Sequence, residues 1–194
     1  MYIDKKQKKN LIEGCYHEIG HIIAAMILFP NDKRIKGISF SRKNNKCAYI
    51  FNTELDFHCE FLIEHIELCT MMYICGGVFQ QMKTIHNKYK CILNKIPHKW
   101  LIFFFRIIVK TQIEGMEIDI DWLEKLHSIA RKCGRINGEL NLQKIKNDAI
   151  NLLSPYIKNK GTDKLVSYII DIIGRKANKE NYIFIDFTII MSYL

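Results

Sequence analysis

The chain has 194 residues, of which 48% are hydrophobic and 25% charged, a balance typical of a single folded domain with a substantial core. Its net charge of +9 is spread along the chain, and no recognisable nucleic-acid motif accompanies it, so we expect no nucleic-acid partner. The seven cysteines include no Cys-x-x-Cys pair, which favours reduced, buried thiols over a disulfide framework. We therefore expect a cytoplasmic protein.

Two apolar stretches need to be distinguished from membrane segments. Residues 11–30 contain two glutamates and two histidines, Glu13, His17, Glu18 and His21, which are costly to bury in a bilayer. Residues 101–109 are interrupted by Arg106 and are far fewer than the ~20 needed to cross a membrane. We expect no transmembrane helix.

A His-Glu-x-x-His pattern runs from His17 to His21 inside the first apolar stretch. Residues four apart lie on the same face of a helix, so both imidazoles can turn toward one metal ion. Glu18 lies beside them, where it can take a proton from a zinc-bound water whose pKa the metal lowers toward ~7. The pattern predicts the zinc site of a metallohydrolase, usually a protease. The alternative is a surface helix with two histidines and an adjacent acid.

A turn and a hairpin follow this helix. The Phe-Pro-Asn-Asp sequence at 29–32 predicts its end. Two β-prone runs, 35–41 and 47–52, flank a polar turn and predict a hairpin. A strand beside a zinc helix can bind an extended peptide along its edge, and a hairpin that only covers the core is an equally good interpretation.

The middle of the chain returns to a helical pattern. Residues 56–82 predict a helix containing a Gly-Gly pair at 76–77, which permits either close packing or a break. Residues 83–111 combine a basic segment with the apolar run at 100–109, which predicts a further helix that packs on the core or on a partner.

Acidic residues cluster at the predicted start of a later helix, around Asp119 and Asp121. Acids at this position cap free backbone N–H groups and interact favourably with the helix dipole, which explains them without a metal. Two histidine ligands, however, require a third, and a carboxylate from another helix is a standard solution. Either aspartate can serve as the third ligand.

The remaining residues, 141–194, predict two or three helices and a last segment, 182–193, that fits helix or strand.

The zinc-helix string at 16–22 resembles that of the peptidase domain of FtsH-type proteases. The order of elements is similar too: a hairpin, a helix leading to the Gly-Gly pair at 76–77, and an aspartate opening a helix that runs into Ile-Ala-Arg at 129–131. The resemblance implies a single domain spanning residues 1–194, with an insertion at about 83–114.

The resemblance also implies roles for individual residues. His17, His21 and Asp121 would bind Zn²⁺, and Glu18 would be the catalytic base. Asp119 is the alternative third ligand, because the local alignment slips by about one position.

Three departures separate this chain from that family. The sequence has no Gly-x-x-x-x-Gly-Lys-Ser/Thr loop and so no ATPase module, which implies a stand-alone domain acting on peptides or unstructured segments. The family's acidic residue after the double glycine is replaced by Gln80 and Gln81, which changes the surroundings of the ligands. The insertion at 83–114 is expected to form a lid or a surface for a protein partner or a second copy of the chain.

The sequence therefore predicts a mainly α, bundle-like zincin peptidase domain with a small β-hairpin or short sheet beside the zinc helix. The predicted activity is zinc-dependent, ATP-independent hydrolysis of peptide bonds. The alternatives are a non-catalytic zinc-binding interaction module, a regulatory metalloprotease of the ImmA/IrrE type, which takes its third ligand from a later Glu, and a purely structural helical protein.

Overall fold

The computed structural model describes residues 5–42, 49–110, 117–137, 141–176 and 182–194. The helices in these ranges are α1 (Lys5–Leu28), α2 (Cys59–Glu64), α3 (Ile66–Lys88), α4 (Lys90–Leu93), α5 (His98–Ile108), α6 (Glu117–Lys132), α7 (Leu142–Ile157), α8 (Lys160–Lys176) and α9 (Phe187–Met191). The strands are β1 (Ile35–Arg42), β2 (Tyr49–Leu55) and β3 (Tyr182–Asp186). This confirms the predicted mainly helical fold with a small sheet.

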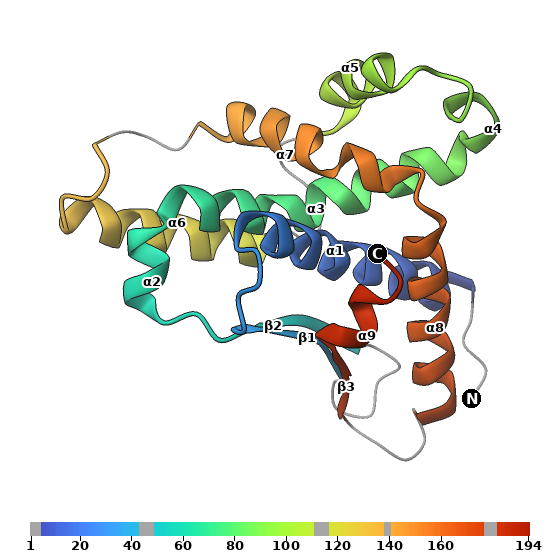
Figure 1. Cartoon of the computed structure of the whole chain (residues 1–194), viewed down its shortest axis with the longest axis horizontal. Helices are drawn as coiled ribbons and strands as arrows, with labels where there is room; N and C mark the ends of the chain where they lie inside the picture. The colour runs from blue at the N-terminus through green and yellow to red at the C-terminus, as the bar shows by residue number, and fades with distance from the viewer. Residues whose placement is uncertain (1–4, 43–48, 111–116, 138–140, 177–181) are drawn as a thin grey trace.

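The two long helices α1 and α3 lie side by side at the centre of the molecule (Figure 1). The sheet and α9 cover one side of this pair, and α7 packs on the other side with α5 outside it. Helix α8 crosses one end of α1, and α6 lies beside α3. The layers are therefore the sheet, then α1 with α3, then α7 with α5.

Glycines allow α1 and α3 to approach each other closely. A Cβ atom added at Gly20 would lie 2.6 Å from the carbonyl oxygen of Cys75 and 2.7 Å from Cβ of Phe79. A Cβ added at Gly76 would lie 2.4 Å from atoms of the His21 ring. Of the two predicted roles for the double glycine, the structure has close packing, since α3 continues through it without a break.

A polar network built around the buried Lys83 connects α1, α3 and α8 near the histidines. Lys83 is fully buried, and its Nζ lies 2.5 Å from Oδ1 of Asp163 and donates to Oγ1 of Thr162 at 2.9 Å. The Tyr16 hydroxyl donates to the same Asp163 oxygen and accepts from the side-chain amide of Asn87. These bonds hold α1 in place one residue before the predicted metal ligands.

The sheet is antiparallel throughout, in the order β2-β1-β3. The predicted hairpin is present as β1 and β2, while the turn predicted at 42–46 lies largely outside the described residues. The C-terminal segment, which fitted helix or strand, contains both, because it begins as β3 and ends as α9. Of the described strands, β2 and β3 each have a neighbour on one side only, and we call β2, which lies beside α1, the outer strand.

Helix α1 is the one helix in the described ranges that is long and apolar enough to cross a membrane. Its most apolar window has a mean hydropathy of 1.3, and 67% of that window is buried. Its buried residues include His17, Glu18 and His21, and its place against α3 accounts for its apolar character. The absence of a transmembrane segment stays a prediction.

Candidate metal centre

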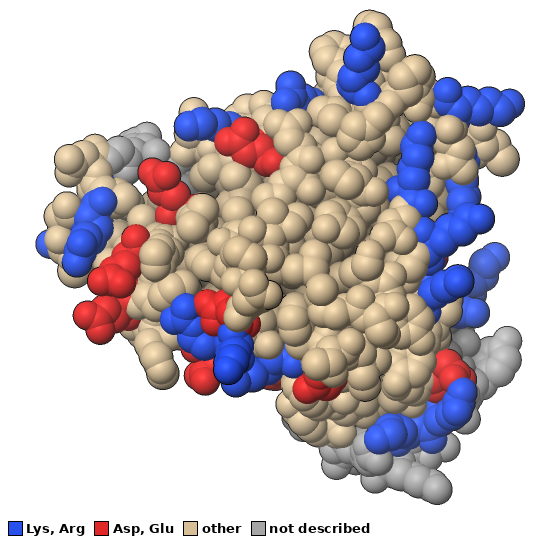
Figure 2. Space-filling model, viewed as in Figure 1, with Lys and Arg blue, Asp and Glu red and all other residues tan. Residues whose placement is uncertain are grey.

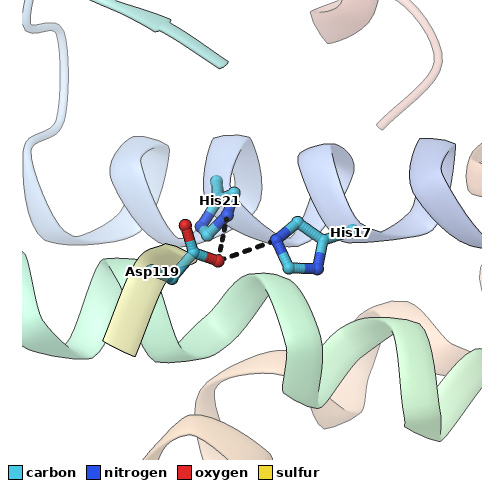
Figure 3. Close-up of side chains that lie close together, drawn as sticks. All are labelled: His17, His21 and Asp119. Carbon is cyan, nitrogen blue, oxygen red and sulfur yellow. Dashed lines mark hydrogen bonds and ion pairs between the residues drawn. The ribbon is translucent and has the colours of Figure 1, made fainter. Parts of the chain in front are cut away.

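Three ionisable side chains from two helices meet beside α3. His17 and His21 project from α1 toward Asp119 in the first turn of α6 (Figure 3). Oδ2 of Asp119 lies 2.9 Å from Nε2 of His17 and 3.7 Å from Nε2 of His21. One donor atom from each residue lies within 4.8 Å of the other two. In the part of the chain that the structure describes, this group can hold a metal ion.

The structure brings Asp119 to the histidines and does not bring Asp121. Two residues along a helix correspond to a rotation of about 200°, so the two side chains leave α6 on nearly opposite sides. Asp119 is partly buried against the histidines, whereas Asp121 is exposed. The aspartate named as the alternative ligand is thus the one placed to bind.

Both imidazole rings are oriented by oxygen atoms on their far side. Nδ1 of His17 donates to Oε1 of Gln80 at 3.1 Å, and Nδ1 of His21 donates to the backbone oxygen of Met72 at 3.0 Å. Each Nδ1 therefore carries a hydrogen, and each Nε2 is the nitrogen left to bind a metal. Metal-binding histidines commonly donate in this way to a second group, which sets the direction of the ring.

The carboxylate of Glu18 is fixed by the sheet. Glu18 is 7% exposed, and the hydroxyl of Thr53 on β2 donates to its Oε2 at 2.6 Å. Because Glu18 follows His17 directly on α1, this bond holds the carboxylate beside the metal group. The sheet therefore positions the predicted catalytic base.

Electrostatics link His21 and Asp119 in the metal-free group. Burial lowers the pKa of His21, but the Asp119 carboxylate, 3.7 Å from its Nε2, outweighs burial and raises it to about 9. Burial raises the pKa of Asp119, but its hydrogen bond to His17 and the nearby His21 outweigh burial and hold its pKa well below the ordinary range. Without a metal, a proton on His21 balances the carboxylate, and a bound cation would take over that role.

The donor set fits zinc. Two imidazole nitrogens and one carboxylate oxygen are a ligand set found in catalytic zinc sites, where the fourth position stays open. Zinc bonds of about 2.0–2.1 Å in a tetrahedron separate neighbouring ligand atoms by about 3.4 Å. The observed separations of 2.9 and 3.7 Å lie on either side of that value.

The ring of His21 packs against Gly76 of α3. Only glycine fits at this position, because a Cβ there would lie 2.4 Å from atoms of the ring.

The metal group opens into a cleft of about 900 Å³. Glu18 and Gln80 line the cleft near the histidines, and Tyr73 lies edge-on to the ring of His21. One wall is formed by β2, from Ile50 to Thr53 together with Leu55. A ligand in the cleft can therefore touch the metal group and the outer strand together.

Sequence reasoning missed two residues that support the site. Thr53 lies just beyond the run expected to form the second strand, and the backbone oxygen of Met72 carries no side-chain signal at all. In the sequence, Gln80 marks only a departure from an acidic residue, whereas in the structure it accepts a hydrogen bond from His17. Gln81 instead bonds the backbone of Lys110 at the end of α5.

Comparison of the chain with protein-family models, curated proteins and solved structures finds no significant match. The relationship to FtsH-type peptidases therefore stays a prediction from the motif and the order of elements. Function has to be inferred from the site itself.

Proposed function

We propose that the protein is a zinc-dependent endopeptidase that hydrolyses peptide bonds in peptides or unstructured protein segments. One observation carries the proposal: Nε2 of His17 and of His21 converge on Asp119 beside a fixed Glu18, at an open cleft. The ligands, the base and room for a substrate are the parts that metal-assisted hydrolysis needs.

The residues divide the work of hydrolysis among them. Zinc held by His17, His21 and Asp119 would act as a Lewis acid, polarising the scissile carbonyl and lowering the pKa of the attacking water. Glu18 takes the proton of that water and returns it to the leaving amine. Thr53 holds the Glu18 carboxylate in the direction that this transfer requires.

The outer strand favours an extended substrate. Because no described strand pairs with the other edge of β2, that edge can pair with a peptide laid along the cleft. Pairing of this kind requires a chain without its own folded structure. This supports peptides and unstructured segments as the substrate class.

The relationship to FtsH-type peptidases is part of the same proposal. It is supported by the His-Glu-x-Gly-His string, by the glycine of α3 packed against His21, and by an aspartate in the first turn of a later helix. The sequence contains no nucleotide-binding loop, so we propose that hydrolysis by this chain is independent of ATP.

A single pair of substitutions tests the activity. Glu18→Gln should retain stoichiometric zinc and lose casein cleavage by at least about 100-fold, the range for loss of a general base. Glu60→Gln is the matched control, because Glu60 is an exposed acid on α2 outside the residues that line the cleft, and this variant should cleave at the wild-type rate. Zinc content is read by metal analysis of the purified protein.

Three results would contradict the proposal. Cleavage by Glu18→Gln at the wild-type rate would show that Glu18 is not the catalytic base. A zinc-loaded wild-type protein that cleaves neither casein nor peptides would favour the non-catalytic zinc-binding module. Absence of zinc from a protein purified without chelators, and unchanged stability on adding zinc, would overturn the metal site itself.

A further inference from the structure

Helix α5 is apolar on two opposite faces. It belongs to the insertion predicted at 83–114, of which residues 111–114 lie outside the described ranges. Its inner face, including Leu101 and Phe105, is fully buried and packs toward α7. Its outer face remains apolar, which is unusual for a helix at the edge of a domain.

The outer face carries three large apolar side chains in one row. Trp100 is 57% exposed, Phe103 is 56% exposed and Ile107 is 67% exposed. Their spacing of three and four residues places them along one side of the helix, about half a turn from the buried face. We call these three residues the α5 ridge. Single exposed apolar residues are common on protein surfaces, but a continuous row indicates a binding surface.

The ridge is a fixed part of the fold. Lys146 of α7 is buried, and its Nζ donates to the backbone oxygens of Arg106 and Val109 at the end of α5. Lys158 donates in the same way to the backbone oxygens of Asn94 and Ile96 before α5 begins. Both ends of the helix are thus bonded to the body of the protein, so the exposed row is presented rigidly.

The surroundings of the ridge are positively charged. Residues 88–110 contain six Lys and Arg residues, all exposed, and no Asp or Glu. In Figure 2, Lys and Arg lie at the top and along the right edge of the molecule, over α5, α4 and α8, whereas the visible Asp and Glu lie mainly at the left, over α6 and α2, and along the bottom. A partner that covers the ridge must therefore be negatively charged as well as apolar.

The position of α5 favours a flat partner over a folded one. Figure 1 places α5 at the outer edge of the molecule, beyond α7. A projecting helix can reach a planar surface without collision elsewhere. Trp and Phe on one face with Lys and Arg around them are typical of helices that lie in the headgroup region of a membrane, where anionic lipids attract basic residues.

We propose that α5 docks the protein on an anionic lipid surface, with Trp100, Phe103 and Ile107 inserted between the lipids and the surrounding lysines and arginine against the headgroups. Docking of this kind needs neither zinc nor peptide hydrolysis. It holds the protein at a membrane surface through α5.

Vesicle sedimentation with the full-length protein tests the proposal. Vesicles of phosphatidylcholine with about one third phosphatidylserine should sediment the wild-type protein, and pure phosphatidylcholine should bind it far more weakly. Replacing all three ridge residues by Ala should weaken binding at least about tenfold. The matched control replaces exposed apolar residues of other elements, Ile129, Phe184 and Met191, and should bind as the wild type does.

A charge variant separates the electrostatic part. Lys95→Gln with Lys99→Gln removes two exposed charges next to the ridge and should weaken binding about 25-fold at low ionic strength, roughly fivefold per charge. Lys125→Gln with Lys132→Gln removes two exposed charges from α6 and should bind as the wild type does. All variants should keep the melting temperature and the zinc content of the wild type, because only exposed side chains change.

Three outcomes would overturn docking on lipid. The first is a wild-type protein that does not bind anionic vesicles. The second is an equal loss of vesicle binding in the ridge variant and in its control. The third is a wild-type dimer in sedimentation velocity that becomes a monomer in the ridge variant without any lipid binding, which would assign the ridge to contact between copies of the chain. Glu18→Gln should bind vesicles normally, so failure of the proposed peptidase would leave this result intact.

Discussion

The hydroxyl of Thr53 donates a 2.6 Å hydrogen bond to Oε2 of Glu18, across 35 residues of sequence. A strand of the sheet thereby sets the direction of a carboxylate on the central helix. The proposed base is thus oriented from outside its own helix, and its alignment depends on how the sheet packs against α1.

Removing this bond should lower turnover without removing zinc. Thr53→Val keeps the shape of the side chain and deletes the hydroxyl, so we expect kcat to fall about tenfold while zinc stays stoichiometric. Thr53→Ser restores the hydroxyl and should recover most of the rate. Peptide cleavage and metal analysis of both variants check this prediction. Equal cleavage rates for Thr53→Val and Thr53→Ser would show that the hydroxyl does not position Glu18.

The third ligand can be assigned by comparing the two aspartates of α6. Asp119→Asn should weaken zinc binding by more than the about 10–100-fold that is typical of losing an outer partner. Asp121→Asn, whose side chain is exposed, should bind zinc as the wild type does. Competition with a chromophoric zinc chelator measures both affinities. Weaker zinc binding by Asp121→Asn than by Asp119→Asn would instead make Asp121 the third ligand.

Gly76 should tolerate no side chain. The Cβ of Gly76→Ala would lie 2.4 Å from Cε1 and Nε2 of His21, so the ring has to move. We expect a loss of about 1–3 kcal/mol in the free energy of unfolding, together with weaker zinc binding.

Gly174→Ala provides the control for the glycine substitution. Position 174 lies inside α8, and a Cβ there meets nothing within 4 Å. This variant should be more stable than the wild type by up to about 1 kcal/mol, because alanine favours the helix. Denaturant unfolding measures the free energy of unfolding of both variants. An equal change in the two would mean that contact with His21 is not the cause of the destabilisation by Gly76→Ala.

The zinc-free protein should have a characteristic pH dependence. The folded pKa of His21 is raised to about 9, so its stabilising contribution is complete below the unfolded value of about 6.5 and is lost as the pH rises through 9. The pKa of Asp119 is lowered, so its contribution is complete above about 3.9 and is lost only in stronger acid. Stability from this pair is therefore greatest between about pH 4 and 6.5.

Unfolding of the chelated protein at several pH values checks this prediction. The wild type should lose stability between about pH 6.5 and 9, and Asp119→Asn should lose much less, because the partner that raises the His21 pKa is gone. Calorimetric titration with zinc near neutral pH should release about one proton from His21. A wild-type stability that does not change over this range would contradict the coupling of the two residues.

Local sequence was sufficient for the centre of the site. The four-residue spacing of His17 and His21 brings both rings to one face of any helix, and Glu18 is adjacent whatever the remaining fold. The mainly helical class and the hairpin also followed from short-range patterns of apolar residues, which depend on helix and strand periodicity alone.

Tertiary structure decided everything that joins distant parts of the chain. Asp119 rather than Asp121 meets the histidines because α6 packs beside α3 in one rotation, and both aspartates fit a helix start equally well in sequence. Thr53 reaches Glu18, and the C-terminal segment becomes a strand, only through long-range pairing within the fold. The sequence by itself determined which atoms can bind a metal, and the packing of helices and sheet determined which of them meet, because contacts between distant residues depend on the whole core and not on local spacing.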